Sequence, residues 1–517
     1  MNAVSESYIG TLLLRFWAAL CAVWEESGTR RLSVRLGRCG ERLFSGSAIF
    51  TVLLREGTVS LAWRDSVVCR TLTVLLNLPA ILLHKLYTAF PAVFDGSFFA
   101  RLAFSVGDET AVAESWIIML LWVIPFDYWN NAYSLMGFFL LLLLFYVGGM
   151  RRRALRLDLG AVGPYAMFFF TAACLAVPFS AYPSLSTRFL TYHVICALCV
   201  LVTVSAVRRM EDLKRLMAGG TFVVLVSSLY GFYQRLQGVE VNASYTDLTV
   251  NADMPGRVES FFDNPNTFAQ VLILLLPLAI VLVLNSRRWY SRLAAAGVFI
   301  VGAGALGMTY SRASWVGFAC GLVVFVFLWK PKLLPGCFVL GLLCIPFLPD
   351  SILHRVQTIT NFSDTSTASR VPLYEAALAL IRRSPVSGAG LGTAAVQKYI
   401  NVNNLYHARA PFVHAHDMYL QIWIEAGLLG VVTFVGGMFW SIKRSAAAVR
   451  HASPSAARTM ACAGAGALAG SMVCGLADYL WNYPRVMCIF WFVFALTLAA
   501  VRLCREEAMP DGLTSPD

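Results

Sequence analysis

The chain has 517 residues, of which 58% are hydrophobic and 14% are charged, and its mean hydropathy is +0.66. Soluble proteins carry roughly 25% charged residues, so this composition excludes an ordinary soluble multidomain protein and predicts a polytopic membrane protein. The 41 Lys and Arg residues exceed the 29 Asp and Glu residues and give a net charge of +12. In a membrane protein such a surplus is first a topology signal, and no nucleic-acid partner is expected.

The first 110 residues differ from the rest of the chain. They contain eleven Lys and Arg residues, and they lack a clean apolar run of the ~20 residues that a spanning helix needs. The stretch 67–90 is apolar, but Arg70, Pro79, His84 and Lys85 interrupt it. We therefore expect residues 1–110 to form a basic region with interfacial helices on the cytoplasmic side of a membrane.

From residue 111 onward, apolar segments alternate with short polar connections. Lipid offers no partner for backbone N–H and C=O groups, so each apolar segment is expected to cross the membrane as a helix. The sequence predicts an all-α polytopic bundle of about twelve spans over residues 111–504. They are expected near 111–125, 131–149, 159–178, 187–207, 212–235, 264–285, 290–309, 311–330, 333–350, 416–440, 456–478 and 484–504.

The short connections between these spans fall into two classes of charge. One class is rich in Lys and Arg, as in 151–156 and 208–215. The other class, around 126–130, 178–186, 309–312 and 478–485, contains Arg312 and Arg485 as its only basic residues. Because basic connections stay on the cytoplasmic side, the alternation orients the whole bundle.

The same rule places the remaining segments. Both termini are predicted to be cytoplasmic, including a short tail over 505–517. Two longer segments, 236–263 and 351–415, are predicted to lie outside, and the second is a large, partly helical loop before the tenth span.

Arg312 lies within Ser311–Trp315, between two apolar segments and on the side where cations are rare. Ionisable residues at membrane depth cost ~2.5–3.5 kcal/mol on insertion scales, so each requires a reason. One interpretation is an arginine that extends to the outer lipid headgroups. The other is a fixed cation whose planar guanidinium binds a lipid-borne phosphate.

A second polar group stands at the start of the tenth span, where His414, His416 and Asp417 occur within four residues. Asp417 falls in the expected first helical turn, near the favourable end of the helix dipole. His416 is either a capped polar residue or a general base, because a neutral imidazole can take a proton from an alcohol. A His-x-His pair without further outer ligands is a weak metal signal, so no metal is expected.

The outer segment 351–415 contains Arg355 and Arg370, followed by apolar residues at helical spacing over 371–382. We expect a helix that lies on the bundle, with Arg370 at its N-terminal entry. A further polar stretch, Asn264–Ala269, begins the sixth span and is typical of an N-cap followed by Pro at N1. Whether Asn266 also faces a ligand stays open.

Together these stretches resemble the O-antigen ligase and O-antigen polymerase family of membrane glycosyltransferases. The resemblance is strongest over 260–436, and the layout of spans extends it over 111–504. The family's outer motif is a His, then Asn, Ser or Gln, then nine residues and GxxG. Here that spacing is kept, with Asp417 at the second position. The matching elements are His416–Gly430, Ser311–Trp315, Ser369-Arg370 with Tyr374, Ser384–Gly392 and Asn264–Ala269.

The resemblance implies transfer of a glycan from an undecaprenyl-diphosphate carrier to a hydroxyl of a glycan or glycolipid acceptor. The reaction would take place at the outer face of the bacterial cytoplasmic membrane, without nucleotide, cofactor or required metal. His416 would be the general base, and Arg312 and Arg370 would bind the donor diphosphate. Either Asp417 or a loop residue would orient the His416 ring, and the supporting residues would be Asp417, His414, Ser311, Asn266 and Arg355.

Two other functions stay open. A polysaccharide polymerase of the same family would need the same donor site and would differ only in its acceptor. A flippase or exporter of a lipid-linked oligosaccharide belongs to another class, whose members tend to show inverted repeats and charges deep inside spans. This chain shows no internal repeat, and its unusual polar groups gather at one membrane side, which favours glycan transfer.

Overall fold

The computed structural model describes residues 58–152, 156–242, 255–357, 370–408 and 411–508, together with single positions between residues 15 and 35. These described residues form helices and turns without a strand, which confirms the predicted all-α fold class. The chain divides into two units. The larger comprises Glu56–Phe325 and Leu348–Asp517, and the smaller comprises Met1–Arg55 and Val326–Phe347.

Nine helices among the described residues are long and apolar enough to cross a membrane. One of them is α6 (Val67–Ala89), and the other eight coincide with expected spans. These eight are α10 (Asn131–Arg151), α13 (Pro183–Ala206), α14 (Met210–Gln237), α15 (Pro265–Asn285), α16 (Trp289–Met308), α17 (Arg312–Trp329), α23 (Met418–His451) and α25 (Pro484–Ala508).

The remaining four expected spans are shorter or less apolar than predicted, so the count of twelve is not established. They correspond to α9 (Thr110–Leu121), α12 (Pro164–Ala176), α18 (Leu334–Cys344) and α24 (Ala456–Cys474). The expected span 159–178 is interrupted because Gly163 has φ +85° and is followed by Pro164. The chain therefore forms a short α11 (Leu159–Val162) before α12 begins.

The low hydropathy of α24 has a packing reason. Its sequence is rich in Ala and Gly, and nearly all of its residues are buried. A Cβ on Gly466 or Gly470 would lie within 2.6 Å of a carbonyl oxygen of α17. Small residues allow two helix backbones to approach closely in a membrane, so α24 is an interior helix with little lipid-facing surface.

The N-terminal part of the larger unit begins with α5 (Thr58–Asp65), α6, α7 (Pro91–Gly96) and α8 (Phe98–Asp108). Although α6 is long enough to span, its long-range polar contacts involve only the last turns of α10 and the segment that follows it. Asn77 exchanges hydrogen bonds with the Leu157 backbone, and His84 Nδ1 lies 2.9 Å from the Met150 carbonyl oxygen. Its other side exposes leucines to the surroundings, as expected of a helix in contact with lipid. An interfacial position for α6 therefore stays a prediction.

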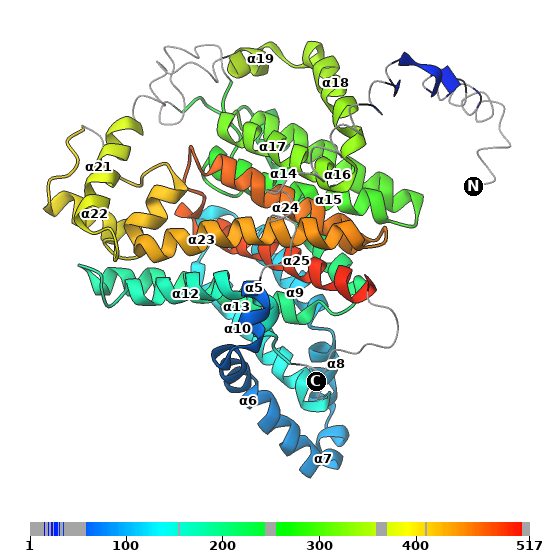
Figure 1. The fold of residues 1–517 in the computed structure, drawn as a ribbon, viewed down its shortest axis with the longest axis vertical. Coiled ribbons are helices and arrows are strands. Elements are labelled where there is room, and N and C mark those ends of the chain that lie inside the picture. Colours follow the sequence, from blue (N-terminus) through cyan, green and yellow to red (C-terminus); the bar gives the residue numbers. More distant parts are fainter. Residues whose placement is uncertain are drawn as a thin grey trace. The chain divides into compact units, whose positions relative to one another are not determined.

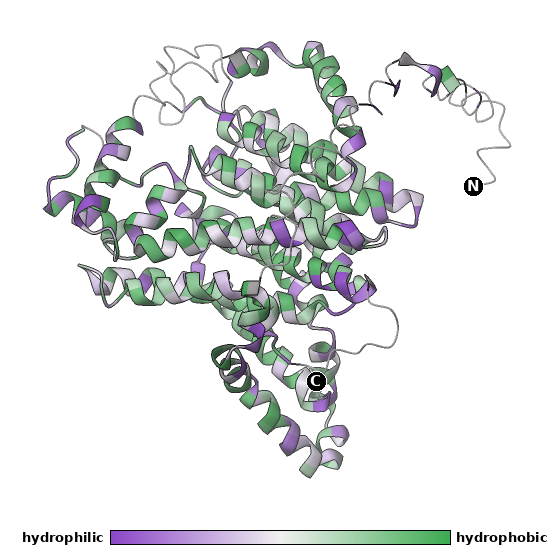
Figure 2. Ribbon diagram, in the orientation of Figure 1, coloured by the Kyte–Doolittle hydropathy of each residue, from purple (hydrophilic) through white to green (hydrophobic). Residues whose placement is uncertain are grey.

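Long helices of the larger unit lie side by side, with α23 packed against α12, α24 and α25 (Figure 1). The end of this bundle at which α23 begins is here called the histidine end. The end at which α13 finishes and α14 begins is called the arginine end. Figure 2 shows hydrophobic residues along the lengths of these helices and hydrophilic residues gathered towards their ends.

Three further helices accompany the histidine end of the bundle. They are α19 (Asp350–Gln357), α21 (Arg370–Arg383) and α22 (Thr393–Val402), and they confirm that the predicted outer loop is partly helical. Figure 1 shows α21 and α22 beside the first turns of α23. The buried face of α21 includes Leu373, Ala377 and Leu380, which pack against Ile424 of α23. Arg370 is the first residue of α21, as the helical spacing predicts.

Candidate active site

His416 lies just before α23 and not on its helical face. The helix begins at Met418, and the Asp417 carboxylate accepts a hydrogen bond from the Leu420 N–H at 2.8 Å as its N-cap. His416 itself has φ +48°, in the left-handed region that histidine adopts more often than most residues. The expected span 416–440 therefore begins two residues later than predicted, and His416 stands before the cap residue and outside the helix.

The ring of His416 is oriented by Asp478, a residue of the connection between α24 and η5 (Leu480–Asn482). His416 Nδ1 lies 3.2 Å from Asp478 Oδ1. A carboxylate oxygen only accepts, so in neutral His416 the Nδ1 atom carries the proton and Nε2 keeps its lone pair. Asp417 is engaged as the cap of α23, so a loop residue, and not Asp417, holds the ring.

Asp478 is itself fixed from two sides. Gln270 of α15 donates from Nε2 to Asp478 Oδ2 at 3.0 Å, and the Tyr479 N–H donates to Oδ1 at 2.9 Å. Burial alone would raise the pKa of the Asp478 carboxyl. The hydrogen bond from His416 and the nearby charges outweigh burial and hold this pKa below its usual range. Asp478 is therefore a carboxylate throughout the physiological range.

His414 packs directly on His416, with ring centroids 4.0 Å apart. His414 Nδ1 accepts a hydrogen bond from the His416 N–H at 3.2 Å, which supports the unusual backbone at that residue. Burial, followed by the charges of His416 and Arg370, lowers the pKa of His414 to about 3. His414 is therefore neutral and serves to shape the loop, whereas the His416 side chain is 35% exposed.

Arg370 contributes positive charge to this group of residues. Its charge lowers the pKa values of both Asp478 and His414, which places its guanidinium within electrostatic reach of the histidine pair. It reaches this position because α21 packs along the first half of α23. The sequence predicts Arg370 and His416 on one side of the membrane, and in the structure both lie at the histidine end of the bundle.

Arg312 begins α17 directly after a sharp turn. Tyr310 has φ +50°, and the Ser311 hydroxyl donates to the Ser314 hydroxyl at 2.9 Å. Ser314 Oγ lies 3.7 Å from Cys474 Sγ at the end of α24, four residues before Asp478. Residues other than glycine rarely adopt the left-handed backbone conformation, and those that do often lie at functional sites. Here Tyr310, two residues before Arg312, and His416 both adopt it.

Asn266 faces a cation of the chain itself. Asn264 caps α15 by accepting hydrogen bonds from the backbone of Asn266 and Thr267, as the sequence predicts. The Asn266 side-chain oxygen accepts a hydrogen bond from Arg257, which also donates from Nε to the Thr309 carbonyl at 2.7 Å. Buried Arg257 therefore ties the start of α15 to the turn that presents Arg312.

Arg355 is buried in α19, near the same turn. The hydroxyls of Tyr310 and Ser351 lie 3.0 Å apart, so the first turn of α19 packs beside the entry to α17. The structure therefore places Arg355 in the last turn of the helix whose first turn contacts the turn before Arg312.

The glycine-rich stretch Ser384–Gly392 fills a break in α23. Gly427 interrupts the helix with φ +69° and ψ −170°, and the freed backbone groups bond to this stretch. The Leu428 N–H donates to the Pro385 carbonyl at 3.1 Å, and the Ala389 N–H donates to the Ile424 carbonyl at 2.7 Å. The GxxG element and the glycine-rich element of the sequence are thus two halves of one joint.

A buried polar chain connects this joint to the histidine loop. Gln421 accepts from the Ala415 N–H and donates to Glu425, each at 2.7 to 2.8 Å. Tyr479, next to Asp478, donates its hydroxyl to the same Glu425 oxygen at 3.2 Å. Glu425 thus links Gln421 of α23 to Tyr479, on the two sides of the site.

The described residues offer one group that could hold a metal ion, formed by His414, His416 and Asp478, whose ligand atoms lie within 4.8 Å of one another. Two imidazoles and a carboxylate suit Zn²⁺ by ligand type. A metal bound between them would have to replace the hydrogen bond of His416 to Asp478. The donor set thus serves equally as a hydrogen-bonded base, and the absence of a required metal stays a prediction.

Sequence reasoning missed three residues of this site, namely Asp478, Gln270 and Arg257. Asp478 carried a usable signal, because it is the sole acidic residue of the connection 478–485. Gln270 and Arg257 carried none, since a glutamine in a span and an arginine in a long loop are common without function.

Residues 296–435 match the O-antigen ligase family. The chain therefore carries an O-antigen ligase domain. This finding confirms the resemblance drawn from the motifs. No curated protein matches the chain.

The O-antigen ligase domain contains Arg312, Arg370 and His416, whereas Asn266 and Asp478 lie outside the matched residues. With its long apolar helices, the chain is a multi-pass membrane protein, and the match over 296–435 supports an enzyme of the O-antigen ligase or polymerase type. Such proteins act on lipid-linked glycans in a bilayer.

Proposed function

We propose that this protein transfers a glycan from an undecaprenyl-diphosphate carrier to an acceptor hydroxyl, as an O-antigen ligase. The observation that carries the proposal is the His416–Asp478 pair, in which the ring nitrogen away from the carboxylate is free to accept a proton. Among the described residues, His416 Nε2 has no hydrogen-bond partner. The nearby positive charge of Arg370 suits an anionic donor.

In the proposed reaction, His416 Nε2 takes the proton of the acceptor hydroxyl as its oxygen attacks the anomeric carbon of the donor sugar. The new carbon–oxygen bond forms while the bond from that carbon to the diphosphate oxygen breaks. The bonding electrons leave with the diphosphate, and direct attack inverts the anomeric centre. Asp478 stabilises the imidazolium that results, because its carboxylate stays ionised.

Arg312 and Arg370 would bind the diphosphate as it gains negative charge. Preorganised cations in a site of low dielectric stabilise such a leaving group more than water does. Arg257 and Asn266 are positioning residues in this scheme, because they fix the turn before Arg312. Ser311 tightens the first turn of α17 through Ser314.

Reconstituted transfer tests the assignment. The purified protein in liposomes receives an undecaprenyl-diphosphate-linked oligosaccharide and a glycolipid acceptor, with and without EDTA. We expect His416→Ala and Arg312→Ala each to lower the rate at least about 100-fold, and EDTA to have no effect. His451→Ala and Arg292→Ala, at the other end of the bundle, are the matched controls. Near-wild-type transfer by either site variant would contradict the proposal.

The same assay separates the related functions. A second lipid-linked glycan offered as the acceptor measures polymerase activity, and a glycolipid acceptor measures ligase activity. A transporter would form neither product. Arg370→Lys should lose most of the activity, because an ammonium group cannot bind two phosphate oxygens in the fork geometry of a guanidinium.

We also propose the location of this reaction. The sorting of Lys and Arg residues between connections places the histidine end outside the bacterial cytoplasmic membrane and both termini in the cytoplasm. The donor and acceptor would then meet at the outer leaflet.

A further inference from the structure

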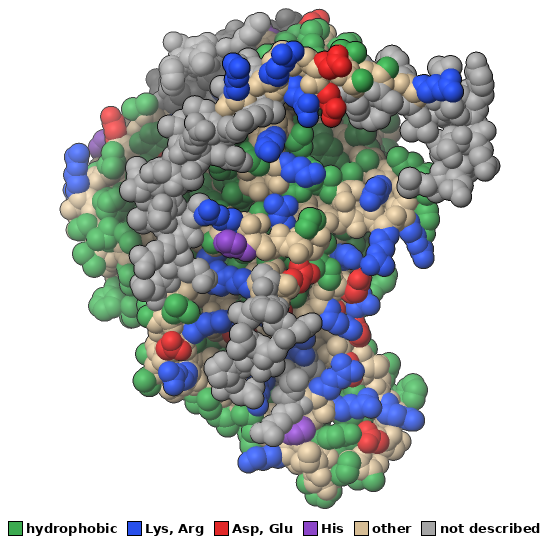
Figure 3. Space-filling view, turned by 45° about the vertical axis from the view of Figure 1, so that its right-hand side comes forward, with side chains coloured by type: hydrophobic (Ala, Val, Ile, Leu, Met, Phe, Trp, Pro, Cys, Tyr) green, Lys and Arg blue, Asp and Glu red, His purple; other side chains and the backbone are tan. Residues whose placement is uncertain are grey.

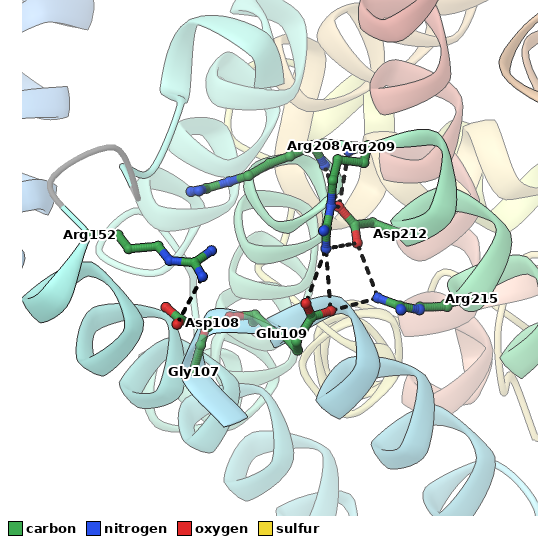
Figure 4. Close-up of polar contacts among 9 residues, drawn as sticks. Gly107, Asp108, Glu109, Arg152, Arg208, Arg209, Asp212 and Arg215 are labelled. Carbon is green, nitrogen blue, oxygen red and sulfur yellow. Dashed lines mark hydrogen bonds and ion pairs between the residues drawn. The ribbon is translucent and has the colours of Figure 1, made fainter. Parts of the chain in front are cut away.

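Arginines gather at the arginine end of the bundle, opposite the candidate active site. Figure 3 shows a face on which Lys and Arg side chains are more frequent than acidic ones. Figure 4 shows the contacts around the last residues of α10 and the first residues of α14. The arginines that matter here are Arg152, Arg208, Arg209, Arg215 and Arg502.

Most of these arginines have a carboxylate partner. Arg152 lies 3.2 Å from Asp108, and Arg215 lies 2.6 Å from Glu109. Arg209 bonds both Glu109 and Asp212, at 3.2 and 3.1 Å (Figure 4). These ion pairs join the end of α8 and the start of α9 to the end of α10 and the start of α14. They give the arginine end a fixed shape.

Arg208 is different. Its guanidinium donates from Nε to the Ser205 carbonyl at 3.4 Å and lies 5.6 Å from the centre of the Phe145 ring. It forms no ion pair with the described residues. Asp212 receives the backbone N–H of Arg208, but Figure 4 shows the Arg208 side chain running away from Asp212 towards the side of Arg152.

Of the four charged groups that act on this guanidinium, three are arginines and one is Asp212. Burial, followed by the charge of Arg502, lowers the pKa of Arg208 to about 10, and Arg152 and Arg209 act in the same direction. Asp212 opposes them, but its carboxylate is already bonded to Arg209. A partly buried cation that faces other cations costs free energy unless an anion joins them.

We propose that Arg208, with Arg152 and Arg502, binds the phosphate of an anionic phospholipid headgroup. A planar guanidinium binds two phosphate oxygens at once, and a phosphate between Arg208 and Arg152 would relieve the repulsion between them. This site is independent of the proposed glycan transfer. Arg152, Arg208 and Arg502 all lie outside the matched residues 296–435.

The position of the site favours a lipid over a free phosphate. Arg208 stands between the end of α13 and the start of α14, where a spanning helix reaches the headgroup layer. Beside it, α10 exposes Phe139, Leu140 and Leu143, whose side chains are about half exposed. Acyl chains can cover these residues while the headgroup phosphate reaches the arginines.

Lipid titration in nanodiscs tests this proposal. The full-length protein is reconstituted in phosphatidylcholine, phosphatidylglycerol is added stepwise, and bound phosphatidylglycerol is counted by native mass spectrometry. Arg208→Gln should weaken phosphatidylglycerol binding about fivefold, the effect expected for one arginine at a membrane surface. The control Arg292→Gln removes an exposed arginine whose side chain bonds the Ser286 carbonyl and no other group of the described residues, and it should change binding less than twofold.

Thermal unfolding in the same nanodiscs provides a second measurement. In pure phosphatidylcholine, Arg208→Gln should unfold at the wild-type temperature or above it, because it removes a partly buried cation that forms no ion pair with the described residues. Phosphatidylglycerol should raise the unfolding temperature of the wild type and not that of the variant. Equal binding and equal stabilisation of both proteins would overturn the proposal.

Two further arms decide the source of the phosphate. Inorganic phosphate at millimolar concentration should leave phosphatidylglycerol binding unchanged, and displacement of the lipid would show that the site takes free anions instead. If Arg208→Gln does not assemble, Arg208→Lys keeps the charge and removes the fork geometry. Arg208→Lys should then bind phosphatidylglycerol more weakly than the wild type does. An affinity equal to that of the wild type would contradict the proposed phosphate contact.

Discussion

His416 owes its chemical character to neighbours that are distant in the sequence. Asp478 fixes the ring through Nδ1, Gln270 and the Tyr479 backbone fix Asp478, and His414 supports the left-handed backbone at His416. Each of these contacts places a proton or a lone pair at a defined atom. Of the two ring nitrogens of His416, these contacts leave Nε2 without a hydrogen-bond partner among the described residues.

Replacement of Asp478 by Asn tests the role of the carboxylate. An amide at this position retains the shape but removes the negative charge that stabilises the imidazolium, so kcat should fall roughly 100-fold to 10,000-fold while KM for the donor changes little. Steady-state kinetics of transfer measure both constants. Asp417→Asn is the control, because Asn caps a helix as well as Asp does, and its kcat should stay within twofold of wild type. Equal losses in the two variants would contradict the assigned roles.

The low pKa of His414 predicts how the free energy of unfolding depends on pH. Its pKa is about 3 in the folded protein and about 6.5 in an unfolded chain, so between these values the unfolded chain binds more protons. Folding stability is therefore complete above pH 6.5 and falls as the pH decreases towards 3, by a few kcal/mol. Thermal unfolding in detergent across this range should show a shallower slope for His414→Gln than for wild type and for the exposed control His451→Gln. Parallel slopes would show that His414 does not carry the dependence.

At the scale of elements, the break in α23 organises the site. Gly427 opens the helix, the stretch Ser384–Gly392 enters the opening, and Glu425 bonds the residues on both sides. Because α21 precedes this stretch directly, the joint also sets where Arg370 lies relative to His416. Broken helices in membranes are tolerated only where protein satisfies the freed backbone groups, as it does here.

Gly427→Ala should disturb this joint. The added Cβ would lie 1.8 Å from the Val386 carbonyl oxygen, and φ +69° is unfavourable for alanine, so we expect a loss of about 2 kcal/mol or more in stability together with most of the transfer activity. Gly297→Ala is the control, since open space surrounds its Cβ in α16, and it should leave unfolding temperature and activity unchanged or raise the former slightly. A folded, fully active Gly427→Ala protein would show that the joint does not position the site.

At the scale of the whole molecule, charge sorting and helix packing agree. The connections rich in arginine and the network around Asp212 lie at one end of the bundle, and His416 with Asp478 lies at the other. A polytopic protein with one polar site at one end suits chemistry at a single leaflet better than transport, which requires a path through the midplane.

Labelling with a membrane-impermeant maleimide tests the orientation. In a cysteine-free background, Val402→Cys on α22 should react in intact cells with a permeabilised outer layer, because this exposed residue lies at the histidine end. Trp289→Cys at the start of α16, also exposed, should react only after the cytoplasmic membrane is opened. The reverse pattern would place the proposed reaction in the cytoplasm and would contradict its location.

The helices and their order could be predicted from the sequence because a span depends on local composition. The break at Gly163 and the small-residue packing of α24 limited that prediction, since both depend on which helices meet. The candidates His416, Arg312 and Arg370 were also accessible from the sequence, because each stands within a short polar stretch between apolar segments, and all three lie within the matched residues 296–435. Local pattern thus determined the fold class, the sorting of basic residues between connections and the candidate histidine.

Only the tertiary structure decided what these residues contact. Asp478 stands 62 residues from His416, and Gln270 stands 208 residues from Asp478, and no local pattern links them. The same holds at the arginine end, where Arg208 resembles its neighbours in sequence but forms no ion pair with the described residues. Hydrogen bonds and ion pairs require distances of a few ångströms, and packing between distant segments alone sets such distances.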